Sequence, residues 1–401
     1  MAVTGWRRKT MIDFTFQNPT KIHFGRNALD QLGGEVEKYG KRILLVYGGG
    51  SIKRTGLYDK VMKILLDLGA HVWELGGVQP NPRLALVYKG IEMCREHDVQ
   101  LVLAVGGGSA IDTGKAIVNG VCYDGDVWDL FCGKGVIDHV LPLGTILTIP
   151  AAGSEMSSSC VITREADLCK VGRNVPFNFP KFSIINPEDS FSLPKYHVAC
   201  GIVDIMAHMM ERYFTQVEHV ELMDRMIEGA LITVINNAQL TLAEPENYDA
   251  RAEITWAGSL AHNTLLQTGR IGDWASHKLE HELSAVYDIA HGAGLAIIFP
   301  AWMKYVLPRG GEKKLAQFAI RVFGVPESMG TMEEIAREGI RRLEAFYRSL
   351  EMPVRLKEIQ IDDRDFERMA AHCAALVGGT VGKFVPLNAE DCRKIYYLAL
   401  E

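Results

Sequence analysis

Four residues in the C-terminal half of the chain have the types and spacing of a metal site: Asp204, His208, His277 and His291. Asp204 and His208 are four residues apart in an apolar stretch that reads as a helix over 198–214, so both side chains can project from one face. A carboxylate and an imidazole are costly to bury in such a stretch without partners. A divalent cation would be a partner for both.

Such an ion needs further ligands, and His277, His281 and His291 offer one more than it requires. His277 and His281 repeat the spacing of four residues, and His291 follows in an Ala-His-Gly-Ala-Gly segment. A set of three imidazoles and one carboxylate accepts Fe(II), Zn(II), Ni(II) or Co(II). The ion could polarise a substrate oxygen, or it could activate water in a metallohydrolase.

Two glycine clusters in the N-terminal half each follow a short apolar run. Residues 48–51 and residues 106–109 both read Gly-Gly-Gly-Ser, and the runs before them are 42–47 and 101–105. Glycine lets the backbone approach a phosphate closely, and exposed N–H groups at the start of a helix attract anions. The clusters therefore predict a dinucleotide site. Its candidate contacts lie within these two clusters.

The residues around the first cluster bear on the choice of nucleotide. NAD sites commonly place an acid at a strand end to bind the ribose 2′-hydroxyl, whereas a 2′-phosphate needs donors and no acid. No acid lies in 48–51, and Lys53 and Arg54 follow directly. This arrangement predicts NADP(H).

Two further polar features lie near the second cluster. Asp112 is in the first turn of the helix after that cluster, where it either complements the helix dipole or contacts the reacting end of the cofactor. A third small-residue loop, 150–155, follows an apolar run at 143–149 and should lie on the cofactor side of the sheet. Thr148 and Ser154 are therefore candidate cofactor contacts.

The elements that must position these residues change in kind along the chain. Short apolar runs at 42–47, 71–75, 101–105, 143–149 and 182–186 read as strands, with helical stretches at 58–68 and 84–96 between them. Such alternation predicts a parallel sheet. Residues 14–16 and 21–24 read as a hairpin. From about 194 the pattern is helical, as at 221–242, 250–267, 332–350 and 363–377. We expect a Rossmann-like α/β domain at 1–190 and an all-helical metal-binding domain at 191–401.

Composition excludes several classes of protein. The 401-residue chain is 48% hydrophobic, and its net charge of -6 gives no support to binding of nucleic acid or a membrane surface. No apolar run approaches the roughly 20 residues of a membrane helix. Residues 1–10 are basic with no apolar stretch behind them, so they do not read as a secretory signal. Eight scattered cysteines predict free thiols and a cytoplasmic location.

Taken together, these motifs resemble the iron-dependent alcohol dehydrogenase family, most closely its NADP(H)-dependent butanol dehydrogenase and aldehyde reductase branch. The motifs that carry the resemblance lie at 47–56, 78–82, 105–112, 153–155 and 291–296. The resemblance implies Fe(II), with Zn(II) possible, held by Asp204, His208, His277 and His291. It also implies that His281 carries a proton and that Lys170 contacts the cofactor. The loop residues that the resemblance implies as cofactor contacts are Gly49, Gly50, Ser51, Gly107, Gly108 and Ser109. The family loop often has threonine where this chain has Ala152, which removes a hydroxyl.

The implied reaction interconverts primary alcohols of butanol size and aldehydes, with hydride from NADPH. We expect a homodimer, because the exposed edge of a hairpin invites pairing with a second copy. Glycerol dehydrogenases and dehydroquinate-synthase-like cyclases share the architecture, but they are expected to favour NAD. The remaining alternatives are a metallohydrolase and a non-catalytic binding protein. A metallohydrolase leaves the glycine clusters unexplained, and a non-catalytic protein leaves unexplained why metal and nucleotide motifs occur together.

Overall fold

The computed structural model describes residues 10–401. The basic segment at 1–10, which we expect not to be a secretory signal, lies outside the described residues except for its last residue. The described chain forms two compact units, each built around its own core. The sheet-containing unit comprises 17–201 and 243–263, and the helical unit comprises 10–16, 202–242 and 264–401. The predicted domain boundary between 190 and 191 stays a prediction. The compact units do not divide the chain at one point, since 243–263 group with the sheet.

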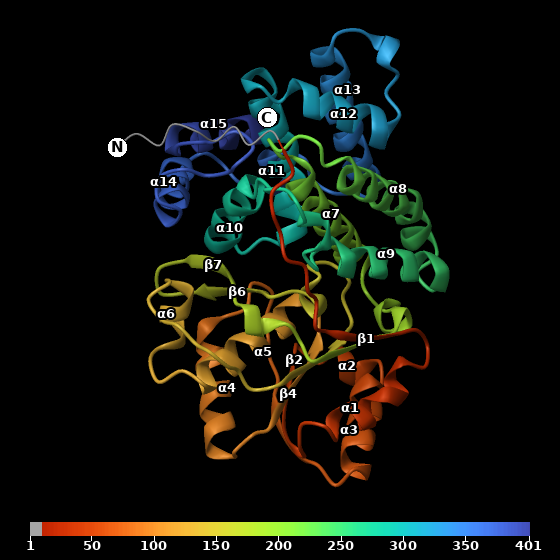
Figure 1. Ribbon diagram of the computed structural model, residues 1–401, viewed down its shortest axis with the longest axis vertical. Helices are drawn as coiled ribbons and strands as arrows, with labels where there is room; N and C mark the ends of the chain where they lie inside the picture. Colours follow the sequence, from red (N-terminus) through yellow and green to blue (C-terminus); the bar gives the residue numbers. More distant parts are fainter. Residues whose placement is uncertain (1–9) are drawn as a thin grey trace. The chain divides into compact units, whose positions relative to one another are not determined.

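Six strands of the first unit form one sheet in which every neighbouring pair is parallel (Figure 1). The strands are β1 (Lys21–Phe24), β2 (Arg42–Tyr47), β3 (His71–Leu75), β4 (Leu101–Gly106), β5 (Leu143–Leu147) and β8 (Phe182–Ile185), in the order β1-β8-β5-β4-β2-β3. The predicted fold, a parallel-sheet unit followed by a helical one, is confirmed. A separate antiparallel pair, β6 (Ser159–Arg164) and β7 (Cys169–Asn174), was not predicted.

Helices cover both faces of this sheet. The helices of this unit are α1 (Leu32–Val36), α2 (Ser51–Arg54), α3 (Leu57–Asp67), α4 (Leu84–Glu96), α5 (Gly108–Val121), α6 (Val127–Phe131) and α9 (Tyr248–Ala261), of which α1, α3, α4, α5 and α6 pack in the two cores beside the sheet. In β4, Val102 and Ala104 face a core shared with α4, α5 and α6, whereas Leu101, Leu103 and Val105 face a core shared with α1 and α3. Burial on both faces explains why this strand is continuously apolar.

The predicted hairpin at the start of the chain is wrong. Residues 14–16 form no strand, and β1 pairs instead with β8, in the register Lys21 to Phe182. The Asn18 side chain, expected in the turn, donates from Nδ2 to the backbone oxygen of Met156 at 2.8 Å. The amide nitrogen therefore ties the segment to a distant loop, while Oδ1 accepts from the Thr20 backbone N–H at 3.2 Å without a hairpin partner.

The helical unit surrounds a nearly fully buried helix. Its helices are α7 (Lys195–Tyr213), α8 (Glu221–Ala243), α10 (Ala275–Tyr287), α11 (His291–Val306), α12 (Glu312–Phe323), α13 (Met332–Ser349), α14 (Phe366–Leu376) and α15 (Ala389–Leu400). The buried helix is α11, which packs against α10, α13 and α15. Phe214, just beyond α7, packs on Trp302 with ring centroids 5.2 Å apart. No helix within 10–401 has both the length and the apolar character to span a membrane.

Candidate metal and nucleotide sites

The predicted metal ligands come from three helices of the helical unit. Asp204 and His208 lie on α7, His277 on α10, and His291 is the first residue of α11. One ligand atom from each of Asp204, His277 and His291 lies within 4.8 Å of the other two. The Nε2 atoms of His277 and His291 are 3.8 and 3.7 Å from Asp204 Oδ1. These three residues therefore face one point through oxygen and Nε2.

His208 and His281 lie beside this group. The His208 ring centroid is 4.5 Å from that of His277, and its Nδ1 is 2.9 Å from the backbone oxygen of Asp204. His208 is not in the set of three residues whose ligand atoms come within 4.8 Å of one another. Its role as a fourth metal ligand therefore remains a prediction. The half-buried His281 has its ring centroid 5.6 Å from that of His291.

Two atoms of the group fit a bound cation. Asp204 Oδ1 and His277 Nε2 are buried without a well-formed hydrogen bond in the described part of the chain, although His208 Nδ1 lies 3.1 Å from Asp204 Oδ1. A buried carboxylate oxygen and a ring nitrogen in this state are costly, and a cation between them would satisfy both. The donor set, one oxygen and imidazole nitrogens, suits a divalent ion such as Fe(II) or Zn(II). The residues present therefore fit the implied metal.

The electrostatics of the group favour a positive charge at the same point. Burial alone would raise the pKa of Asp204, but His208 and His291 hold it well below its ordinary value. Burial lowers the pKa of His208 to about 4, so that ring is neutral near pH 7. Burial would also lower the pKa of His277, but Asp204 and Glu211 raise it to about 9. Asp204 is thus an ionised carboxylate, and His277 carries a proton near pH 7 that a bound cation would have to displace from Nε2.

The three glycine and small-residue loops follow neighbouring strands of the sheet. Residues 48–50 follow β2, residues 107 and 108 follow β4, and the loop at 148–153 follows β5. From β2 the chain continues to β3 on one side, and from β4 it continues to β5 on the other. This reversal is the position at which open parallel sheets bind nucleotides, beyond the carboxyl ends of the strands.

Local geometry explains the glycines in these loops. Gly50 has φ 97°, a left-handed conformation, and nothing lies within 4 Å of the places where Cβ atoms of Gly49 or Gly50 would stand. At Gly107, which caps α5, a Cβ would lie 2.8 Å from Ile149 Cβ. No side chain caps the first turn of α5, which leaves its N–H groups to an anion. Ser51 opens α2, and Ser109 is the second residue of α5.

Asp112 holds the third loop in place. Its Oδ1 accepts from Ser154 Oγ at 2.6 Å, and its Oδ2 accepts from the backbone N–H of Val161 at 2.9 Å. The fully buried Lys115 donates from Nζ to the backbone oxygen of Ser154 at 2.7 Å. Burial raises the pKa of Asp112 and lowers that of Lys115, and the opposite charges oppose both shifts. In this structure Asp112 thus orders the loop, and its predicted cofactor contact stays a prediction.

The other predicted cofactor contacts lie near the same loops. Thr148 is buried, and its backbone N–H donates to Gly106 O at 2.9 Å. Lys170, on β7, is buried and donates from Nζ to Asn81 Oδ1 at 2.9 Å. The backbone oxygen of Ala152 lies 2.9 Å from His262 Nδ1, so this position is held by its main chain.

Three buried charged residues of these sites were not predicted: Lys115, Glu211 and Glu280. Glu211 Oε1 is 2.8 Å from His277 Nδ1, and Glu280 Oε2 bonds His291 Nδ1. Lys115 is three residues after Asp112 in an otherwise apolar stretch, which is a signal that pattern reading could have used. Glu211 is 66 residues from His277 and carried no such signal.

The parallel sheet is covered on both faces and carries glycine loops of the kind that bind phosphates. The helical unit holds a buried group of one carboxylate and imidazoles. Together these features are typical of an enzyme that uses a nucleotide and a metal. Residues 19–187 match the model of the iron-containing alcohol dehydrogenases, and 198–400 match the C-terminal model of the same family. The chain belongs to the iron-containing alcohol dehydrogenase family, and it is an alcohol or aldehyde oxidoreductase that uses a nicotinamide cofactor and a divalent metal. The hydrolase and the non-catalytic alternatives therefore lose their support.

Individual relatives cover almost the whole chain. A probable NADH-dependent butanol dehydrogenase 1 of Bacillus subtilis is 47% identical over 97% of this chain and 100% of its own. The NADPH-dependent aldehyde reductase YqhD of Escherichia coli is 36% identical over 97% and 100%. The crystal structure of an NADH-dependent butanol dehydrogenase A from Thermotoga maritima is 39% identical, with a TM-score of 0.94 over 98% of this chain and 100% of that one.

Proposed function

We propose that this protein interconverts butanol-like primary alcohols and the corresponding aldehydes with NADP(H), and that its working metal is Fe(II). The observation that carries the proposal is the convergence of Asp204 Oδ1 with the Nε2 atoms of His277 and His291. When bound, the cation supplies Lewis acidity at the substrate oxygen and the nicotinamide supplies the hydride.

The chain's own residues have separate tasks in this reaction. Asp204, His277 and His291 would hold the cation, with His208 as the proposed fourth ligand. His281 would deliver the proton that the product oxygen needs during reduction, because it is half-buried and can exchange protons with water. The backbone N–H groups of the loops at 48–51 and 106–109 would bind the nucleotide phosphates.

The first test is NADPH oxidation with butanal by metal-stripped protein reconstituted with Fe(II) under anaerobic conditions. We expect turnover that requires both the metal and NADPH, and little turnover by the metal-free protein. Absence of turnover with NADPH and with NADH would contradict the proposed reaction. Reconstitution with Zn(II) in parallel tests the choice of metal.

The preference for NADP(H) rests on the loop after β2. The acid nearest to it in the sheet is Glu74 on β3, whose Oε2 accepts from the Tyr47 hydroxyl and whose Oε1 accepts from the Tyr58 hydroxyl, both at 2.7 Å. A carboxylate engaged by two hydroxyls is a poor acceptor for a ribose. Lys53 donates from Nζ to the same carboxylate at 3.4 Å and is half-exposed, so a 2′-phosphate would compete with Glu74 for this amine.

Direct titration of nucleotide fluorescence tests this preference, since two relatives are named for NADH and one for NADPH. We expect NADPH to bind more tightly than NADH. Lys53→Met should weaken NADPH binding roughly tenfold, because a charge-assisted bond is lost, and leave NADH binding unchanged. Tighter binding of NADH by the wild type would contradict the proposal.

We also propose a cytoplasmic homodimer. All eight cysteines are free thiols, which suits a reducing compartment. Among the described strands none pairs with the outer side of β1, and Phe24 on that strand packs its partly exposed ring against Trp256. Such an edge favours association with a second copy. Light scattering should give twice the mass of one chain, and the mass of a single chain would contradict the dimer.

A further inference from the structure

Two buried carboxylates stand directly behind the imidazoles of the metal group. Glu211 is near the end of α7, and Glu280 is on α10; both are almost completely buried. Each bonds the Nδ1 of a different histidine, His277 and His291 respectively. In both histidines the other nitrogen, Nε2, faces Asp204 Oδ1. The carboxylates and the candidate metal position therefore lie on opposite sides of the two rings.

Glu211 is fixed by several bonds at once. Its Oε1 accepts from His277 Nδ1 at 2.8 Å and from the His277 backbone N–H at 3.0 Å, and its Oε2 accepts from the Trp274 backbone N–H. The backbone oxygen of Glu211 also accepts from Asp273 N–H at 2.8 Å. One residue of α7 thereby sets both the start of α10 and the rotation of the His277 ring.

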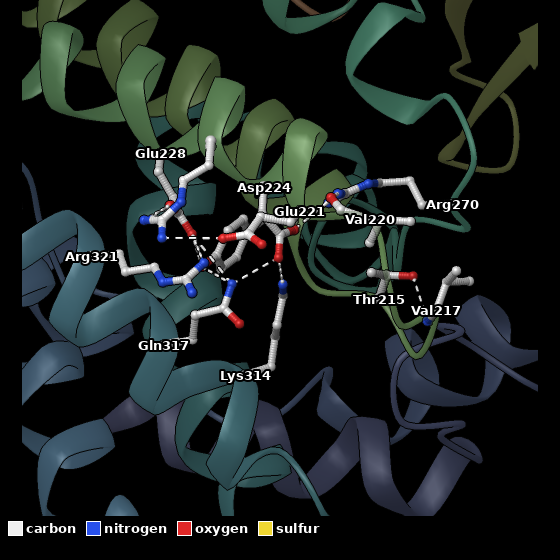
Figure 2. A network of polar contacts seen from close by, with 12 residues as sticks. Thr215, Val217, Val220, Glu221, Asp224, Glu228, Arg270, Lys314, Gln317 and Arg321 are labelled. Carbon is white, nitrogen blue, oxygen red and sulfur yellow. Dashed lines mark hydrogen bonds and ion pairs between the residues drawn. The ribbon is translucent and has the colours of Figure 1, made fainter. Parts of the chain in front are cut away.

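The end of α7 that carries Glu211 is bonded by Arg270, which also belongs to the polar network of Figure 2. Arg270 donates to the backbone oxygens of Arg212 at 3.2 Å and Val220 at 2.8 Å. Its guanidinium lies 2.9 Å from Asp224, which also accepts from Lys314 Nζ at 2.5 Å. The Arg212 carbonyl, one of those that the end of a helix leaves unpaired, is thus satisfied, which helps to keep Glu211 in place.

Glu280 is enclosed as tightly. Its Oε2 bonds His291 Nδ1, and its Oε1 accepts from Ser284 Oγ one turn later on α10. Across from it, a Cβ at Gly294 of α11 would lie 2.6 Å from Glu280 Cγ. Glycine at this position makes room for the carboxylate between α10 and α11. The packing therefore confines the Glu280 carboxylate to one position, on the Nδ1 side of the His291 ring.

We propose that Glu211 and Glu280 are positioning residues of the metal site, a role that rests on the proposed metal function. Each holds its histidine in the form that carries the proton on Nδ1, so that the Nε2 lone pair is free for the cation. Neither carboxylate belongs to the group of three whose atoms face the Asp204 oxygen; Glu280 lies in a second close group with His281 and His291, where its carboxylate bonds His291 Nδ1. Partners of this kind fix ring orientation and raise the basicity of the ligand nitrogen, and their loss typically costs about 10–100-fold in metal affinity.

The test is a titration of metal-free protein with Co(II), followed by its visible absorbance and by competition with a chelator. We expect Glu211→Gln and Glu280→Gln to bind Co(II) roughly 10–100-fold more weakly than wild type and to shift the absorbance bands, since an amide removes the negative charge behind the ring. The band shift reports the ligand field at Co(II), and comparison with a matched control variant separates it from a general loss of packing.

Glu282→Gln is the matched control. Glu282 is also a buried carboxylate of α10 and bonds a histidine, His372 Nδ1, at 2.9 Å, but His372 is outside the metal group. Its Co(II) affinity and spectrum should equal those of wild type. Circular dichroism checks folding, and if Glu211→Gln does not fold, Glu280→Gln decides the question.

The outcomes separate the two proposals. If wild type binds Co(II) and the two variants bind it with unchanged affinity and spectrum, the positioning role is wrong while the metal site stands. Equal weakening in Glu282→Gln would also overturn the role, because it would reflect general loss of packing. If wild type itself binds no Co(II), the proposed metal function is wrong, and the positioning role falls with it.

Discussion

Among single residues, Lys115 shows most clearly how one buried charge can organise a binding loop. Its amine donates to the backbone oxygens of Ser154, Ser157 and Ser159 at 2.7–2.8 Å and opposes the charge of Asp112. A loop without regular hydrogen bonding needs such a donor to satisfy its carbonyl groups. The amine therefore satisfies three backbone carbonyl groups along residues 154–159.

Lys115→Met should lower the free energy of unfolding by about 3–5 kcal/mol, since it leaves Asp112 and several backbone oxygens buried without their partner. Urea unfolding followed by circular dichroism measures this. Lys60→Met, on the exposed side of α3, should change it by less than about 0.5 kcal/mol. Equal stability of the two variants would show that the loop does not depend on the amine.

At the scale of secondary-structure elements, close packing decides where glycine is required inside a helix. Gly90 on α4 faces α5, and a methyl group there would lie 2.7 Å from Ile117 Cγ1 and 2.9 Å from Leu75 Cδ2. Gly229 on α8 is exposed, with nothing within 4 Å of its Cβ position. The same residue type thus has a packing role in one helix and none in the other.

Alanine at these two positions should change the free energy of unfolding in opposite directions. Gly90→Ala should destabilise by about 1–3 kcal/mol through overpacking, whereas Gly229→Ala should stabilise by about 0.4–1 kcal/mol because it restricts the unfolded chain. Thermal and urea unfolding of both variants measure the difference. A Gly90→Ala protein as stable as wild type would mean that α4 and α5 can separate without cost.

A buried carboxylate joins α1 to β1, and its titration gives a second element-scale prediction. Glu35 on α1 bonds Lys21 Nζ at 2.7 Å and His23 Nε2 at 3.0 Å, both on β1. Burial would raise the pKa of Glu35, but Lys21, Lys38 and His23 lower it from 4.5 to about 2. Because the folded pKa is depressed, these bonds stabilise the fold above pH 4.5, and the stabilisation is lost as pH falls toward 2.

Glu35→Gln should therefore cost about 1–2 kcal/mol near pH 7, a figure kept low because both lysines are half-exposed. The gap in the free energy of unfolding between wild type and variant should narrow below pH 4.5 and close near pH 2. Urea titrations at a series of pH values measure it. A gap that stays constant with pH would contradict an ionised Glu35.

At the scale of the whole molecule, each compact unit contains one candidate ligand site. The metal group lies within the helical unit, and the glycine loops lie within the sheet-containing unit. A ligand that binds only the folded form adds its binding free energy to stability. Each unit should thus be stabilised by its own ligand.

Removal of the metal should lower the melting temperature of the protein by several degrees. Saturation at about 100 times Kd contributes about 2.7 kcal/mol, and each kcal/mol shifts Tm by roughly 2–4 °C in a unit of this size. Calorimetry of Co(II)-loaded protein with and without chelator measures the shift. Asp204→Asn should melt at the same temperature in both conditions; a wild type that ignores the chelator would contradict the site.

Periodicity in the sequence was sufficient for most elements, because burial on both faces makes a central strand continuously apolar and burial on one face gives a helix a 3.6-residue repeat. Strands at 42–47, 71–75 and 101–105 were predicted closely for this reason. The predicted hairpin at 14–24 failed because β1 pairs with β8, some 160 residues away, and local pattern carries no information on such pairing.

By itself the sequence determined residue chemistry and local spacing: the Asp-x-x-x-His pair of α7, the glycine loops after β2 and β4, and the change from alternating elements to helices. These properties depend on near neighbours along the chain. Only the tertiary structure decided which ring nitrogens face Asp204 and that Glu211 and Glu280 stand behind them. The reason is that a side-chain rotation is set by contacts between distant helices, and those contacts exist only once the helices have packed.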